Sequence, residues 1–109
     1  MIHPNAWRIV VFAVLVGLGS SAHAHGLVCN CEELPDRLVR CTGGFSSGDG
    51  VPNVTVDVID YNERILIPGK FGADSTFTFK RPSGEFYVLM DVGAGHVLEV
   101  DHQQIQPRR

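Results

Sequence analysis

The sequence predicts an all-β fold, a small antiparallel β-sandwich of six or seven strands. Apolar and polar residues alternate with period two in several short segments after Cys41, and clusters of glycine, proline, asparagine and aspartate separate those segments. No segment between them has a convincing helical periodicity. A hydrophobic content of 44% excludes a wholly disordered chain, and 109 residues leave room for one small domain.

The expected strands follow one another along the chain. We expect the first strand at residues 37–42, because Pro35 limits the preceding stretch to a turn of helix at most. Alternating side chains predict further strands, and two apolar-rich runs predict strands that are more buried. The alternating segments are residues 54–59, 76–79 and 97–101, and the apolar-rich runs are residues 64–68 and 85–92.

The first residues are typical of a cleavable signal peptide. Arg8 precedes an uncharged run over residues 9–19, which has about half the ~20 residues that a membrane-spanning helix needs. Ala22 and Ala24 then form the small-x-small pattern of a cleavage site. We therefore expect a signal peptide over residues 1–24 and a β-sandwich domain over residues 25–109, periplasmic or secreted and not spanning the membrane. An uncleaved N-terminal anchor is the alternative.

Cleavage after Ala24 makes His25 the first residue of the mature chain. A free α-amine and the His25 imidazole can chelate one ion, and Cu(II) and Ni(II) favour such nitrogen ligands. Cleavage after Ala22 would instead leave a histidine in third place, which is a different nitrogen chelate. The plain alternative is that the cleavage site lies beside a histidine by coincidence.

Several motifs resemble the carboxypeptidase regulatory-like, transthyretin-like β-sandwich. They comprise a glycine-bounded turn before a valine-rich strand, an aspartate followed by alternating phenylalanines, and a Gly-x-Phe-Tyr-Val run. The segments are residues 44–48, 54–58, 74–79 and 84–88. The resemblance implies the fold and says little about activity, because such modules occur in many proteins.

A narrower resemblance concerns the two ends of the chain. The Ala-His-Ala-His-Gly run at residues 22–26 and the closing motif at residues 91–100 are similar to small periplasmic accessory proteins of bacterial nickel/cobalt transporters. This resemblance implies a metal-binding protein that presents nickel, cobalt or copper to a membrane transporter. The alternative is a small exported protein-interaction module that binds no metal.

The candidate metal ligands are histidines, cysteines and one carboxylate. His96 follows a glycine-rich turn, where binding loops gather, and we expect it to partner His25. His102 lies six residues further on, roughly 20 Å away along an extended strand, so the two cannot share an ion. We expect His102 to lie near a frayed, exposed C-terminus. The candidates are His25, Cys29, Cys31, Cys41, His96 and His102, with Asp101 as a possible carboxylate.

The three cysteines admit two interpretations. In an oxidising compartment Cys41 would pair with Cys29 or Cys31 and leave one free thiol. Alternatively, Cys29 and Cys31 would join Cys41 or His25 in a thiolate site for soft Cu(I) or for Zn(II). A bond between Cys29 and Cys31 is disfavoured by their one-residue spacer.

Catalysis and nucleic-acid binding have little support. Cys41, His96 and Asp91 supply the residue types of a nucleophilic set, but nothing in their spacing positions an oxyanion hole. The sequence has no phosphate-binding loop and no dinucleotide fingerprint. A net charge of −3 provides no basic surface for nucleic acid. We therefore expect no enzymatic activity and no nucleic-acid partner.

Overall fold

The computed structural model describes residues 26–108 and is an all-β structure of two antiparallel sheets. Its strands and two short turns of 3-10 helix occur in this order: β1 (Leu27–Leu34), η1 (Pro35–Arg37), β2 (Leu38–Phe45), β3 (Thr55–Asp60), β4 (Ile65–Ile67), β5 (Thr76–Lys80), β6 (Phe86–Gly93), β7 (His96–Asp101) and η2 (His102–Gln104). The predicted fold class and number of strands are confirmed. No helix among the described residues is long and apolar enough to span a membrane.

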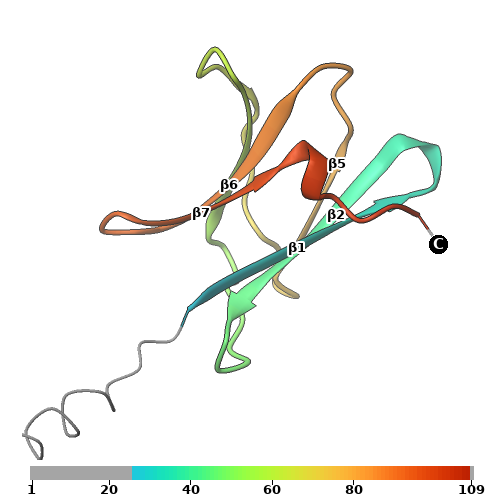
Figure 1. Ribbon diagram of the computed structural model, residues 1–109. Helices are drawn as coiled ribbons and strands as arrows, with labels where there is room; N and C mark the ends of the chain where they lie inside the picture. The colour runs from blue at the N-terminus through green and yellow to red at the C-terminus, as the bar shows by residue number, and fades with distance from the viewer. Residues whose placement is uncertain (1–25, 109) are drawn as a thin grey trace, which may run out of the picture.

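One sheet has the strand order β1-β2-β5 and the other has the order β4-β3-β6-β7. Strand β1 packs beside β7, so these two edge strands form one flank of the sandwich, with β4 and β5 on the opposite flank. Figure 1 shows β1 and β7 starting on the same side of the molecule and running in the same direction.

The start of the fold differs from the prediction. The strand expected first is the second, and it is preceded by β1, whose eight residues pair with β2 from Leu27 opposite Phe45 to Leu34 opposite Leu38. The residues between them form a tight turn in which Asp36 and Arg37 have positive φ angles. Strand β1 was missed because its inward-facing positions include two cysteines, which behave here as small apolar side chains.

The core lies between the sheets and consists mainly of aromatic and β-branched side chains. Strand β6 contributes Phe86, Val88 and Met90, and the loop before β5 contributes Phe71; all four are at most 1% exposed. Gly43 on β2 is required by this packing, because a Cβ there would lie 2.7 Å from the Phe71 ring. The central position of β6 confirms the prediction of a buried strand there.

Strand β4 does not fit the prediction that the apolar-rich run at residues 64–68 forms a buried strand. It has only three residues and lies at a sheet edge, where Ile65 is 56% exposed and Leu66 is 42% exposed. An apolar run alone does not distinguish a central strand from an edge strand, because the distinction depends on which neighbours the chain supplies. Here β4 pairs with β3 alone, and Pro68 follows directly after its last residue.

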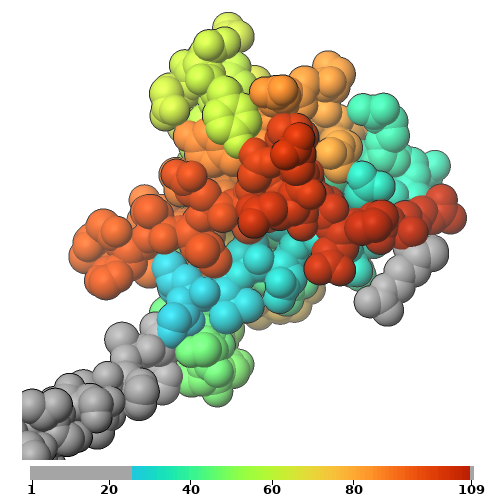
Figure 2. Space-filling model, viewed as in Figure 1, coloured from blue at the N-terminus to red at the C-terminus, as the bar shows by residue number. Residues whose placement is uncertain are grey.

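The C-terminal segment crosses from one sheet to the other. After η2, Ile105 is buried in the core, and Gln106 pairs in parallel with β1. The Gln106 amide donates to the carbonyl of Cys31 (2.9 Å), and the Glu33 amide donates to the carbonyl of Gln106 (2.9 Å). Figure 2 shows this segment lying directly beside β1. The expectation of a frayed C-terminus is therefore wrong for the residues up to Gln106.

Candidate metal centre

Three cysteines gather on the inner side of the β1–β2 pair. Cys29 and Cys31 lie two residues apart and face the same side of β1, and Cys41 lies directly opposite Cys31 on β2. Their three sulfur atoms all lie within 4.8 Å of one another. In the part of the chain that the structure describes, no other group of three histidine, cysteine or acidic side chains is this compact.

Cys31 and Cys41 form a disulfide, and Cys29 is a free thiol. This is one of the two pairings that the sequence left open. The carbonyl of Cys31 points away from β2 towards Gln106, as in a non-hydrogen-bonded pair, where opposing strands approach most closely. The Cα atoms of the two cysteines are 4.0 Å apart. The register of the hairpin therefore selects Cys31 as the partner of Cys41.

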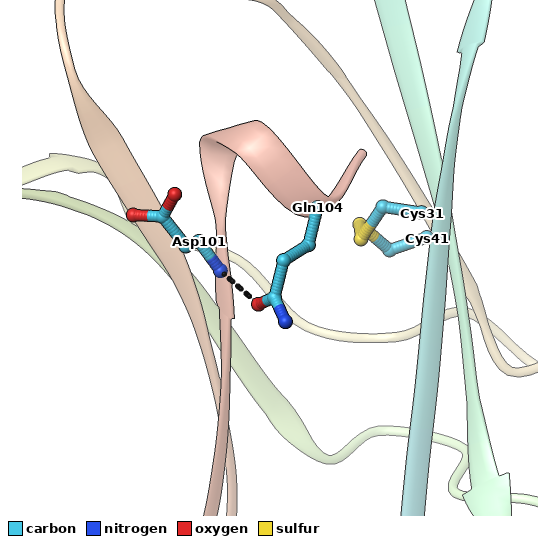
Figure 3. The surroundings of a disulfide bond; sticks show 4 residues. All are labelled: Cys31, Cys41, Asp101 and Gln104. Carbon is cyan, nitrogen blue, oxygen red and sulfur yellow. Dashed lines mark hydrogen bonds between the residues drawn. A yellow bond between two sulfur atoms is a disulfide. The ribbon is translucent and has the colours of Figure 1, made fainter. Parts of the chain in front are cut away.

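The disulfide is covered by the C-terminal segment. Cys31 is 2% exposed and Cys41 is completely buried. Figure 3 shows the two sulfur atoms pointing towards Gln104 of η2. The side chain of Gln104 accepts a hydrogen bond from the Asp101 amide (2.9 Å), which closes the η2 turn over this part of the core.

The Cys29 thiol lies in a groove between β1 and β7. The groove has a volume of about 270 Å³, and its walls include Cys29, Cys31, Leu98 and Gln104. Burial raises the pKa of the Cys29 thiol to about 11, so the sulfur is protonated at neutral pH in the disulfide-bonded protein. In this state the cluster offers a metal one protonated thiol and no thiolate.

Reduction of the disulfide would change the chemistry of the cluster. Three thiols within 4.8 Å of one another match the ligand type and compactness that Cu(I) and Zn(II) sites require. A bound cation would also lower the pKa of each thiol, because metal coordination favours the thiolate. The cluster can therefore serve either as a structural disulfide or as a thiolate site, but not as both at once.

His96 lies apart from the cysteine cluster, at the turn between β6 and β7. It pairs with Gly93 across that turn, and its side chain is exposed. Gly93, Ala94 and Gly95 all have positive φ angles, which makes this turn tight. His25, its predicted partner, lies outside the described residues. The pairing of the two histidines therefore stays a prediction.

His102 is not the exposed tail residue that the sequence predicted. Its side chain is only 18% exposed and packs against the Phe86 ring, with 5.6 Å between the ring centroids. Its Nδ1 lies 3.2 Å from the carbonyl oxygen of Phe86. The neighbouring Asp101 also has hydrogen-bond partners within the protein. Its carboxylate accepts hydrogen bonds from the Tyr61 hydroxyl and the Gln103 amide. The hydrogen bond from Tyr61 is the main reason that the pKa of Asp101 is lowered.

Sequence reasoning missed a cleft on the opposite flank. It has a volume of about 750 Å³ and lies between the β3–β4 turn and the β5–β6 loop. Its walls include Tyr61 and Leu66, which are 52% and 42% exposed, together with the charged side chains of Lys80, Arg81 and Glu85. The exposure of Leu66 depends on the edge position of β4, which no local sequence pattern records.

Comparisons with protein families, curated proteins and solved structures found no match for this chain. The resemblances given above therefore remain predictions about its family and function.

Proposed function

We propose that the protein is an exported accessory protein that binds a transition metal ion and presents it to a membrane transporter. The ion is held in the reduced protein by the thiolates of Cys29, Cys31 and Cys41. The observation that carries this proposal is the convergence of the three sulfur atoms within 4.8 Å from two paired strands. Of nickel, cobalt and copper, Cu(I) suits a site of three sulfur ligands best.

The fold supports such a site mechanically. Cys31 and Cys41 are held opposite each other by the β1–β2 ladder, which does not depend on their bond. Loss of a disulfide that closes a loop of this length costs about 3 kcal/mol in the chain-entropy model. A metal ion shared by the same sulfur atoms would restore the cross-link and offset that cost.

The groove beside Cys29 supports transfer as well as binding. Three sulfur ligands satisfy Cu(I) and leave one position of a tetrahedral ion free. The groove opens this side of the cluster between β1 and β7, so a ligand of a receiving protein would approach along it. An ion wholly enclosed by the core would lack such a path.

The test is a Cu(I) titration of the full chain, reduced with a phosphine without oxygen, against a competing colorimetric chelator. We expect one ion per chain. Cys29→Ser should weaken binding by at least about 100-fold, because it removes a metal bond outright. Asn30→Ser changes the next residue on the same strand, whose side chain is exposed, and should leave the affinity unchanged. Equal affinity for a variant that lacks all three cysteines would overturn the assignment.

A second metal site at the N-terminus is supported by the position of His96. Strand β1 begins on the same side of the sandwich as the β6–β7 turn that holds this histidine (Figure 1). A site formed by the free amine, His25 and His96 would bind Cu(II) or Ni(II) without needing reduced cysteines. In that case His96→Ala would abolish Ni(II) binding by the processed, oxidised protein. An added N-terminal methionine would have the same effect, whereas Cys29→Ser would not.

A further inference from the structure

We propose that the Cys31–Cys41 disulfide is reversible and is opened through Cys29, which relays thiol–disulfide exchange between the groove and the buried bond. This inference deepens the proposed function, because the exchange would supply the three thiols of the metal site. It stands on the burial of the three sulfur atoms and on their spacing.

The burial of the cluster separates one accessible sulfur from two inaccessible ones. Cys41 is completely buried and Cys31 is 2% exposed, so an external thiol has little direct access to their bond. Cys29 is only partly buried and lines the groove between β1 and β7. Cys31 also lines this groove but is almost completely buried, so Cys29 is the most accessible of the three cysteines to a reductant that approaches along it.

The spacing brings Cys29 close enough to react with the bond. Its sulfur lies within 4.8 Å of both disulfide sulfur atoms. The residue opposite Cys29 on β2 is Gly43, so no side chain from its direct cross-strand partner stands between the thiol and the disulfide. A nucleophile held at this distance reacts faster than a free reductant of the same reactivity, because it does not first have to diffuse to the bond and be oriented there.

The same geometry explains why Cys31–Cys41 is the resting bond. Cys29 and Cys31 are separated by two residues of extended strand, roughly 6.6 Å between Cα atoms, and Cys29 is diagonal to Cys41, roughly 7–8 Å away. Disulfides are commonest at Cα separations of about 5.5–6 Å and become difficult beyond about 7 Å, so both bonds that include Cys29 would lie at the long end of this range. Bonds that include Cys29 are therefore short-lived intermediates, and the directly opposed pair is favoured.

The exchange begins within the protein and needs no external electrons. The Cys29 thiolate attacks one sulfur of the Cys31–Cys41 bond. A new bond to Cys29 forms, the old bond breaks, and the leaving sulfur takes the electron pair and then a proton. The product carries a disulfide sulfur in the groove.

A dithiol protein of the exported compartment then completes the reduction. One of its thiolates attacks the Cys29 sulfur, forms a mixed disulfide and releases the other cysteine as a thiol. Its second thiol attacks the mixed disulfide and releases Cys29. The reductant leaves as an internal disulfide, having given up two electrons and two protons, and the chain holds three thiols.

The test measures how fast dithiothreitol reduces the disulfide in the folded, full chain, with alkylation and mass spectrometry used to count thiols over time. Cys29→Ser and Cys29→Ala should both slow reduction by at least about tenfold, because the relay is lost. The matched control Asn30→Ser should react at the wild-type rate. In a denaturant all four proteins should react equally, and circular dichroism should show that each is folded beforehand.

Equal reduction rates for the wild-type and both Cys29 variants under native conditions would overturn the relay. No metal is present in this experiment, so such a result would leave the proposed metal function standing. Conversely, a relay that operates in a protein that binds no Cu(I) when reduced would contradict the metal function alone.

Discussion

Both flanks of the sandwich consist of edge strands, but only one of them is covered by a further segment of the chain. On the β1–β7 flank, the C-terminal segment buries Ile105 in the core and hydrogen-bonds to β1 through Gln106. On the β4–β5 flank, Ile65 and Leu66 are exposed, and the Leu66 side chain borders an open cleft. The closed flank contains Cys29 and Cys31 on β1, whereas β4 and β5 contain no cysteine.

This difference shows what a short C-terminal extension contributes. Unpaired edge strands are available for pairing with other chains, and proteins commonly cover them. Here the cover also separates the disulfide from solvent and leaves a narrow groove at Cys29. Arg81 ties the cover to β1, because its guanidinium contacts both Glu33 (2.7 Å) and the carbonyl oxygen of His102 (3.5 Å). The sulfur chemistry of the protein thus depends on the segment that closes this flank.

The largest expected difference between the flanks is in thiol reactivity. Burial raises the pKa of the Cys29 thiol from 9.0 to about 11, so its thiolate fraction at pH 8 falls by about a hundredfold. We expect iodoacetamide to alkylate Cys29 about a hundredfold more slowly than a cysteine placed on the open flank by Leu66→Cys in a Cys29→Ser background. Quenched time courses with mass spectrometry measure both rates.

The pH dependence of the same reaction sharpens this comparison. The alkylation rate of Cys29 should keep rising between pH 9 and 11, whereas the rate of the open-flank thiol should level off near pH 9. Because the pKa of Cys29 is higher in the folded than in the unfolded chain, stability present below about pH 9 should be lost as the pH rises to 11. A plateau in the alkylation rate of Cys29 near pH 9 would show that its thiol is as solvated as the thiol introduced by Leu66→Cys.

The next difference concerns apolar packing on the two flanks. Ile105→Ala should lower the free energy of unfolding by about 2–3 kcal/mol, because Ile105 is only 8% exposed and packs in the core. Leu66→Ala should change it by less than about 0.5 kcal/mol, because its side chain is already 42% exposed. Urea unfolding of the disulfide-bonded proteins measures both. Similar losses for the two variants would mean that the flanks are equally closed.

The smallest expected difference lies within the closed flank, between the first residue of β7 and the η2 turn that follows this strand. His102→Ala should lower the free energy of unfolding by about 1–2 kcal/mol, because it removes packing on Phe86 and leaves a partly buried carbonyl without its partner. His96→Ala should have an effect below about 0.5 kcal/mol, since that side chain is exposed. The same urea series tests this pair, and a neutral His102→Ala would restore the original expectation of an exposed tail.

Much of the fold could be predicted because β-strands leave a local signal. The alternation over β3, β5 and β7 and the glycine-rich turns between strands are visible without any partner strand. Strand β1 has the same alternation, but its inward positions hold cysteines, which in a sequence can equally indicate metal ligands or core residues. Which strand lies at an edge depends on pairing between distant segments, so the exposure of β4 could not be predicted.

The candidate site could be predicted only in part for the same reason. The sequence favoured two disulfide pairings, but the choice between them depends on the register of β1 and β2, which places Cys31 opposite Cys41. The burial of His102 depends on contact with Phe86, sixteen residues away. The convergence of all three sulfur atoms is likewise a property of paired strands, because Cys41 is ten residues from Cys31 in the chain.

The central claim is that three cysteine sulfurs hold one ion in the reduced protein. X-ray absorption spectroscopy at the copper edge, on reduced full chain loaded with one equivalent of Cu(I), tests it most directly. The account predicts a first shell of three sulfur atoms at roughly the 2.3 Å typical of metal–thiolate bonds. It also predicts that Cys29→Ser reduces the shell to two sulfur atoms. A first shell of nitrogen or oxygen atoms alone would contradict the claim.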